Sequence, residues 1–285
     1  MAGIKLYLRS VQAELLLLRR RVSYWIILAV YAVTGMLFSY VFPYLIYRDA
    51  IGGPEAAARI ALAILLPENL VRYSLTGFPF YAGIMVFIVG VLAVGSEYNW
   101  GTFTNTLVQR ASRSRIMLSK LTALAIALLP FVAINYILGA GFSAGIAMIE
   151  SAPITWPPLW DIARALALSW YILLLWATFG AFLAVLSRGT ALAIGLGIFY
   201  ALVVEGVIAL FGRQIDALLF ISRIFLRTAG YSIVTSLGAM VAGEGGPGAF
   251  EGPFITPARA AVTMAAYITL FSAYVVFTVN RRDVN

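Results

Sequence analysis

Long apolar runs alternate with short polar segments along most of this chain. Five runs contain no charged residue and a sixth contains only Glu205; together they cover residues 22–47, 73–96, 121–149, 165–187, 189–212 and 260–280. Each run exceeds the ~20 helical residues that are needed to cross a ~30 Å hydrocarbon core. We therefore predict six membrane-spanning helices, at about residues 23–47, 78–96, 117–149, 162–186, 190–211 and 260–280.

Composition places the whole chain in one class. Of its 285 residues, 62% are hydrophobic and 11% are charged, and the mean hydropathy is +0.94. These values lie outside the range of soluble proteins. The predicted fold is an all-α membrane protein in which residues 1–285 form a single transmembrane domain. The first apolar run is too long for a cleaved signal peptide, so we expect it to be retained as a span.

Two further segments are predicted to be helical without spanning. Residues 1–21 place apolar and basic side chains on opposite faces, which predicts an interfacial helix; the apolar face carries Ile4, Leu8, Val11, Leu15 and Leu18. The outer segment, residues 213–259, contains two apolar stretches that are too short to span. Short outer helices of this kind either re-enter the membrane or cap the bundle, and the pattern is compatible with both.

Basic residues indicate the orientation, because Lys and Arg collect on the cytoplasmic side of a membrane. With the N-terminus inside, the inner segments carry twelve of the 20 basic residues and three acids, a net charge of +9. The outer segments carry eight basic and nine acidic residues, or −1, and the total is the formal +8. We therefore expect a multi-pass protein of the cell membrane with both termini in the cytoplasm. This split explains the basic composition without a nucleic-acid partner.

Few polar groups lie within the spans. The chain has no Cys and no His, so thiolate and imidazole chemistry is absent, and we expect no catalytic site, no metal site and no enzymatic activity on this chain. Glu205 and Asn135 are candidates for a substrate path. The alternatives are an ion pair of Glu205 with Arg213, solvation of Glu205 at the interface, and a helix–helix hydrogen bond for Asn135.

Glycines within the spans are interpreted as close-packing positions, namely Gly139, Gly141, Gly145, Gly195 and Gly197.

The polar segment between the second and third spans, residues 97–115, carries the most specific pattern. Glu97-Tyr98 is followed by Gly101-Thr102, then by Leu107 and Arg110, by Ser112-Arg113, and by Lys120 at the start of the next span. This pattern resembles the permease subunit of type-2 ATP-binding-cassette (ABC) transporters. The resemblance extends to the six spans, the N-terminal interfacial helix and the inner turn at residues 186–190. Ala111 stands where that family usually has a proline before the Ser-Arg pair.

The resemblance implies that residues 97–115 form an inner helix that couples an ATPase to the spans. A short helix that is continuous with two spans can carry a partner's motion into them. Charges of both signs and exposed aromatic side chains suit a protein interface. The positive-inside rule alone also explains the arginines, but not the acid, the glycine or the tryptophan. The coupling residues implied are Glu97, Tyr98, Trp100, Gly101, Thr102, Phe103, Arg110, Arg113 and Arg115.

ATP hydrolysis is expected to belong to another polypeptide. No phosphate-binding loop of the form G-x-x-x-x-G-K-[ST] occurs, and the lysines are Lys5 and Lys120. The resemblance implies cytoplasmic ATPase subunits that bind ATP and Mg, a second permease subunit that is the same or a homologous chain, and membrane lipids as partners. It implies export of an amphipathic or hydrophobic substrate such as a lipid, drug or peptide. The alternative is an ATP-independent secondary transporter or channel.

The absence of natural cysteines makes the orientation directly testable. We expect single cysteines at Ser112→Cys and Gly246→Cys to react with a membrane-impermeant thiol reagent from opposite sides of intact cells, because the charge split places residue 112 inside and residue 246 outside. Labelling of Ser112→Cys from outside the cell would reverse the whole topology.

Overall fold

The computed structural model describes residues 2–51, 55–99, 113–212, 215–239 and 254–281, and within them every regular element is a helix. The first half contains α1 (Ala2–Arg20), α2 (Val22–Met36), η1 (Leu37–Val41), α3 (Phe42–Ala50), α4 (Glu55–Leu65), η2 (Pro67–Asn69), α5 (Leu70–Thr76), η3 (Phe78–Ala82), α6 (Gly83–Asn99), α8 (Arg113–Ala127) and α9 (Leu129–Ile149). The second half contains α10 (Leu159–Ser187), α11 (Thr190–Phe199), η4 (Tyr200–Val204), α12 (Glu205–Gly212), α13 (Asp216–Ser222), α14 (Leu226–Thr235) and α15 (Pro257–Arg281).

Six helical units of the described residues are long and apolar enough to cross a membrane. They are Val22–Asp49, Phe78–Ser96, Ser114–Ile149, Leu159–Ser187, Thr190–Ile208 and Pro257–Val279. In lipid every backbone N–H and C=O must be satisfied within the protein, and continuous helices achieve this. The prediction of an all-α, multi-pass membrane protein is therefore confirmed.

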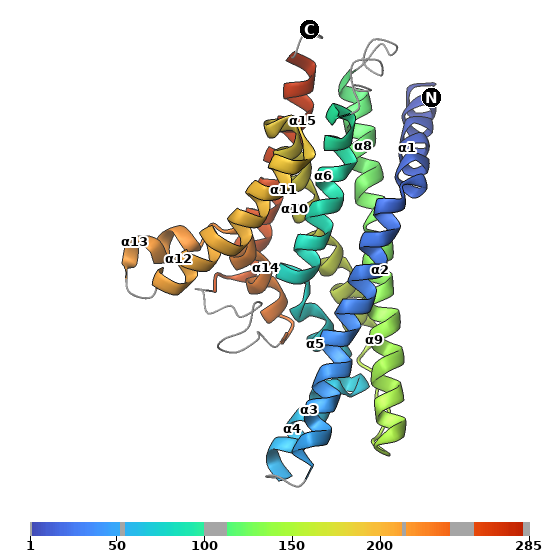
Figure 1. The fold of residues 1–285 in the computed structure, drawn as a ribbon, viewed down its shortest axis with the longest axis vertical. Coiled ribbons are helices and arrows are strands. Elements are labelled where there is room, and N and C mark those ends of the chain that lie inside the picture. The colour runs from blue at the N-terminus through green and yellow to red at the C-terminus, as the bar shows by residue number, and fades with distance from the viewer. Residues whose placement is uncertain (1, 52–54, 100–112, 213–214, 240–253, 282–285) are drawn as a thin grey trace.

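The helices are arranged so that both chain ends lie at one end of the molecule (Figure 1). The end of α6 and the start of α8 lie at this same end, whereas α3, α4 and the last turns of α9 lie at the opposite end. We call these the terminal end and the distal end. α1 runs alongside α8 at the terminal end, and its interfacial placement in a membrane stays a prediction.

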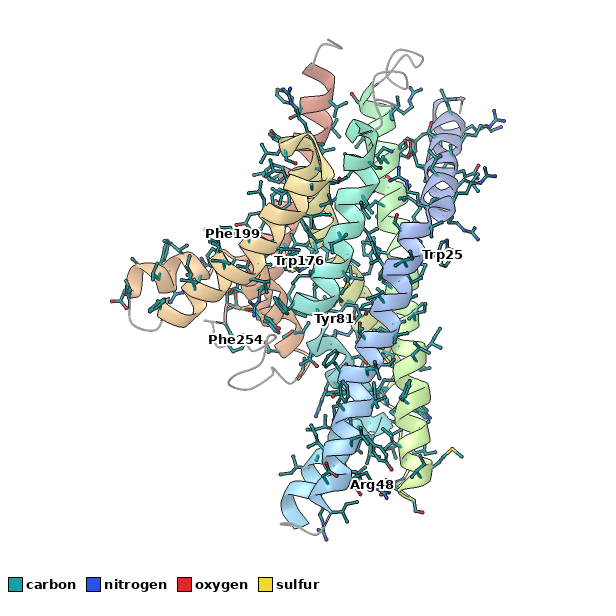
Figure 2. All side chains as sticks on the ribbon, viewed as in Figure 1. Trp25, Arg48, Tyr81, Trp176, Phe199 and Phe254 are labelled. Atoms are coloured by element: carbon teal, nitrogen blue, oxygen red, sulfur yellow. The ribbon has the colours of Figure 1, made fainter. Side chains whose placement is uncertain are left out.

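The core is built around α10, which packs against α6, α11, α14 and α15. Trp176 lies in the interior between α10 and α6 (Figure 2), and its Nε1 donates a hydrogen bond to the Pro79 carbonyl at 3.1 Å. Glycines bring the two helix backbones together, because a Cβ at Gly90 would overlap the Ala177 carbonyl and a Cβ at Gly180 would overlap the Phe87 carbonyl. Close approach at small residues is a common means of helix association in membranes, where apolar surface alone provides no driving force.

The third span is much longer than a bilayer is thick. It covers Ser114–Ile149, 36 residues, or about 54 Å at 1.5 Å per residue. Pro130 lies in its first α9 turn, and α8 ends at Ala127, so the helix is interrupted where the proline removes a donor. The third span is therefore long enough to extend beyond the ~30 Å hydrocarbon core.

The glycines of the spans fall into two groups. A Cβ at Gly139 would lie 3.1 Å from Leu70 Cδ1, and a Cβ at Gly197 would enter the Phe87 ring, so both are close-packing positions. The same interpretation is wrong for Gly141, Gly145 and Gly195, because a Cβ at any of them would meet no atom within 4 Å.

We predict that Gly90→Ala destabilises the bundle, because its methyl group has to displace the α10 backbone, and overpacking of this kind costs ~1–3 kcal/mol. The measurement is the fraction of detergent-solubilised protein that remains monodisperse after heating. Gly195→Ala is the control, and with its open surroundings it should match the parent or gain slightly in helix propensity. Equal heat resistance of the two variants would contradict the close α6–α10 contact.

Candidate functional site

The predicted coupling segment is bounded by two described helices. α6 extends to Asn99 and α8 begins at Arg113. The side chains of Glu97, Tyr98 and Arg113, and all of residues 100–112, lie outside the described part of the structure. The roles predicted for Trp100, Gly101, Thr102, Phe103 and Arg110 therefore stay predictions. Arg115 is half-buried in the first turn of α8.

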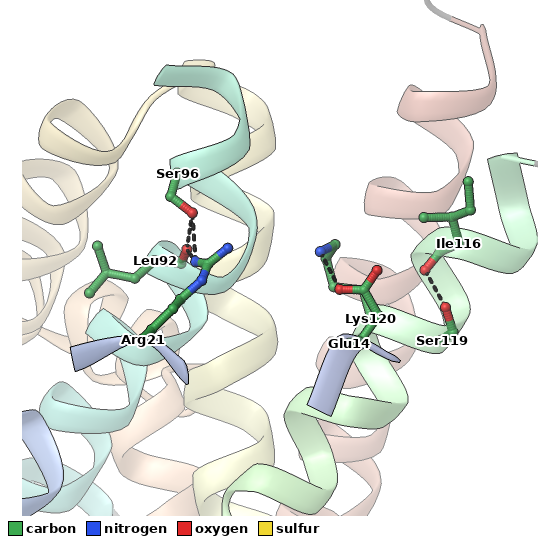
Figure 3. Close-up of polar contacts among 7 residues, drawn as sticks. All are labelled: Glu14, Arg21, Leu92, Ser96, Ile116, Ser119 and Lys120. Atoms are coloured by element: carbon green, nitrogen blue, oxygen red, sulfur yellow. Dashed lines mark hydrogen bonds and ion pairs between the residues drawn. The ribbon is translucent and has the colours of Figure 1, made fainter. Parts of the chain in front are cut away.

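A buried ion pair joins α1 to the helix that follows this segment. Lys120 Nζ on α8 donates a hydrogen bond to Glu14 Oε2 on α1 at 2.7 Å (Figure 3). The two side chains are 4% and 10% exposed. Two residues after Lys120, the Thr122 hydroxyl lies 2.6 Å from that of Tyr7, on α1. These contacts fix α1 along the first turns of α8.

Arg21 makes the corresponding contact with the helix that precedes the segment. It lies in extended backbone between α1 and α2. Its Nη1 donates to the Ser96 hydroxyl at 2.6 Å and to the Leu92 carbonyl, both in the last turns of α6 (Figure 3). The N-terminal helix and its junction with α2 therefore hold both flanks of residues 100–112.

The Glu14–Lys120 contact is costly to break because it is charged and enclosed. Removing one partner of a buried ion pair leaves an uncompensated charge, which costs ~3–5 kcal/mol. A displacement of α8 would therefore move α1 with it rather than break the Glu14–Lys120 contact. The sequence analysis counted Glu14 only as an inner charge and used Lys120 as an inner charge and as part of the permease-like pattern, without relating the two. The available signal was that Glu14 lies on the apolar face of α1, with Val11, Leu15 and Leu18.

Glu205 lies in a second polar cluster, inside the bundle. The π-helical turn η4 directly precedes it, and such turns often occur where a helix accommodates a functional or strained site. Its carboxylate is 2% exposed, so the interpretation of a solvated interfacial residue is wrong. Glu205 Oε1 accepts the backbone N–H of Arg227 at 3.3 Å, and Arg227 Nε lies 3.9 Å from Oε2.

This cluster connects the fifth span to α14. An acid at the first residues of a helix is favourable because the helix N-terminus carries unsatisfied N–H groups and a partial positive charge. The Arg227 guanidinium also lies 4.4 Å from the centre of the Phe80 ring, which is a cation–π distance. The ion-pair partner is thus Arg227, whereas the suggested Arg213 lies outside the described residues. The geometry makes Glu205 the cap of a buried helix.

Asn135 is not part of this cluster. It is half-buried on α9, and its side-chain amide has no hydrogen-bonded partner among the described residues. Across the same residues, no three His, Cys, Asp or Glu side chains are close enough to hold a metal ion.

We predict that Lys120→Met destabilises the terminal end by ~3–5 kcal/mol, because it leaves the Glu14 carboxylate buried without its ammonium partner. Thermal unfolding and protease cleavage within residues 100–112 would report this change. The double variant Glu14→Leu/Lys120→Met should recover most of the loss, and Lys5→Met, on the exposed part of α1, should change little. Equal effects of Lys5→Met and Lys120→Met would show that the buried pair is unimportant.

Comparison with known proteins adds a family but no activity. No curated protein matches the chain. One family profile, described as a protein of unknown function (DUF2705), matches residues 25–285. The match includes Lys120, Glu205 and the whole coupling segment, whereas Glu14 and Arg21 precede it. Because it covers all but the first 24 residues, the chain belongs to the DUF2705 family.

Proposed function

We propose that this chain is the membrane-spanning permease subunit of an ABC exporter. In this proposal it lies in the cell membrane with both termini in the cytoplasm, and ATP is hydrolysed by a separate subunit. The pattern of residues between the second and third spans supports it, as does the gathering of both chain ends, the end of α6 and the start of α8 at one end of the molecule (Figure 1).

The observation that carries the proposal is the double attachment of α1. Lys120 binds Glu14 after the segment, and Arg21 binds Ser96 before it. A segment held on both sides by a charged, mostly buried network cannot shift alone. Docking of a partner that moves residues 97–115 would therefore displace α1, α6 and α8 together, and α6 packs directly on the central helix α10. Such a connected element can bias two states of a bundle.

The residues assigned to docking keep their proposed roles. Glu97 and the arginines Arg110, Arg113 and Arg115 would form charge pairs with the ATPase, and Trp100 and Phe103 would supply its apolar contact. ATP and Mg would be bound by the partner. A second permease subunit would complete the transporter.

The cavities support an amphipathic substrate. A polar cavity of about 970 Å³ lies between α5, the start of α10 and the end of α14, and its lining includes Glu68, Arg72, Asp161 and Arg164. Neither arginine lies within ion-pair distance of a carboxylate in the described part of the chain. Charges of both signs can bind a polar head, whereas the surrounding spans are apolar. A lipid, drug or hydrophobic peptide fits this combination better than a uniformly polar molecule.

Isolation of the tagged protein from native membranes tests the proposal. We expect an ATPase with a phosphate-binding loop to co-purify, and Glu97→Ala to reduce its association or uncouple its ATP turnover from transport. Loss of a semi-buried charge contact costs ~2–5 kcal/mol, whereas an exposed pair is worth ~1 kcal/mol or less. Arg188→Ala is the matched control, since Arg188 is an exposed inner base at the end of α10.

The second candidate is a secondary transporter or channel, favoured by the buried charge of Glu205 within the fifth span. It predicts transport by the protein alone in vesicles. Transport without any ATPase, together with equal behaviour of Glu97→Ala and Arg188→Ala, would replace the ABC proposal.

A further inference from the structure

An apolar groove lies at the distal end, between the first and third spans. Its volume is about 460 Å³, within the ~300–1,000 Å³ range of small-molecule sites. η1 and α3 contribute Tyr40, Val41, Tyr44 and Leu45 to one wall. α9 contributes the other wall, with Ile137, Leu138, Gly141, Phe142, Gly145, Ile146 and Ile149.

Two glycines form the floor of the groove. Gly141 and Gly145 are one helical turn apart, and a Cβ at either position would meet no protein atom within 4 Å. The missing side chains therefore leave open space rather than admit a neighbouring helix. Gly139, which faces Leu70 and Tyr40, shows the contrasting close-packed case on the same helix.

Helix length places the groove across the far edge of a hydrocarbon core that begins at Val22. α2 has 15 residues and begins at Val22, at the basic terminal end; η1 follows with 5 residues and ends at Val41. About 20 helical residues span about 30 Å. On the facing helix, the Tyr24 hydroxyl donates to the Ala127 carbonyl at 2.7 Å, so the two helices are level there. The residues that follow Val41 and the last turns of α9 then extend past the core. Ile137, Ile149 and Leu45 beside the groove are exposed.

A polar cluster lies at the distal limit of the groove. Glu150, which follows α9, accepts hydrogen bonds from the hydroxyls of Tyr44 at 2.6 Å and Tyr47 at 2.9 Å. The Tyr44 hydrogen bond is the main cause that lowers the pKa of Glu150, so this carboxylate stays ionised and attached to α3. Arg48 Nη1 donates a hydrogen bond to Glu150 Oε1 at 3.5 Å and forms an ion pair with it. The arginine side chain is 55% exposed at the distal end of α3 (Figure 2), so further N–H donors of its guanidinium are accessible.

We propose that this groove binds one acyl chain of an anionic phospholipid from the leaflet opposite the chain termini. The chain lies over Gly141 and Gly145, and the phosphate lies at the exposed guanidinium of Arg48. An apolar trough that opens at the level of the lipid chains, with a cation at its outer limit, matches the two parts of such a lipid. The inference depends on the groove alone and not on an ATPase partner.

Photolabelling tests this proposal on the full chain in vesicles without ATP or any other protein. The probes are phosphatidylglycerol and phosphatidylcholine that carry the same diazirine-labelled acyl chain. We expect labelling within residues 137–149 and 40–45, with the anionic probe favoured about threefold, as an exposed ionic contact would give. Arg48→Gln should make the two probes equal. Glutamine retains an N–H donor for Glu150, which Tyr44 and Tyr47 also hold, so the attachment of α9 to α3 persists in this variant.

Filling the groove supplies the second arm. Gly141→Leu/Gly145→Leu should reduce labelling of the groove to the level seen elsewhere on the spans, whereas Gly195→Leu, an equally open glycine on α11, should not. Labelling that is unchanged by the double substitution overturns the proposal, and so does equal labelling by both probes in the parent. The labelled chains are also examined for crosslinks between two copies of the protein. A crosslink at the groove that forms in the parent and is lost in the filled variant would show that a second copy covers the groove, and this result also overturns the proposal.

Discussion

The contact between α6 and α10 is the constraint on which the rest of the bundle depends. Gly90 and Gly180 let the two backbones approach more closely than any side chain permits. Trp176, on α10, then reaches the Pro79 carbonyl at the start of the second span. α10 also contacts α11, α14 and α15, and α11 and α15 in turn contact α6 and α8, so the second half of the chain packs on the first around this helix. A shift of α6 would consequently be felt throughout the bundle.

The spans differ in length, so the longer ones extend beyond the shorter ones at both ends of the molecule. The second span has 19 residues, about the length that a bilayer requires, whereas the third has 36. The excess of the third span forms two extensions. At the terminal end the first turns of α8 pack against α1. At the distal end the residue that follows α9, Glu150, accepts hydrogen bonds from Tyr44 and Tyr47 of α3. Each extension is fixed by a carboxylate, Glu14 in the first case and Glu150 in the second.

Fold class followed from the sequence because apolar length alone determines whether a helix can span. The six spans were predictable for that reason. Contacts between residues distant in the chain were not, since no local pattern relates Glu14 to Lys120 or Glu205 to Arg227. Glycines show the same limit: Gly139 and Gly141 are two residues apart, yet only the neighbours of the helix decide that one packs closely and the other is open. The residues predicted to couple an ATPase, Glu97 to Arg115, remain identified by their pattern, and the structure adds the helices that hold them.

The two buried ion pairs differ in what their charges do. At the terminal end, Glu14 and Lys120 lie on helices that are not adjacent in the chain, and their contact decides whether α1 follows α8. Inside the bundle, Glu205 instead satisfies the start of α14, so its charge maintains a helix end that would otherwise carry unsatisfied N–H groups. A capping charge is needed wherever the start of α14 stays buried, whereas a charge pair between two helices couples the position of one helix to that of the other. The Glu14–Lys120 pair is therefore better suited than Glu205 to pass a displacement from one helix to another.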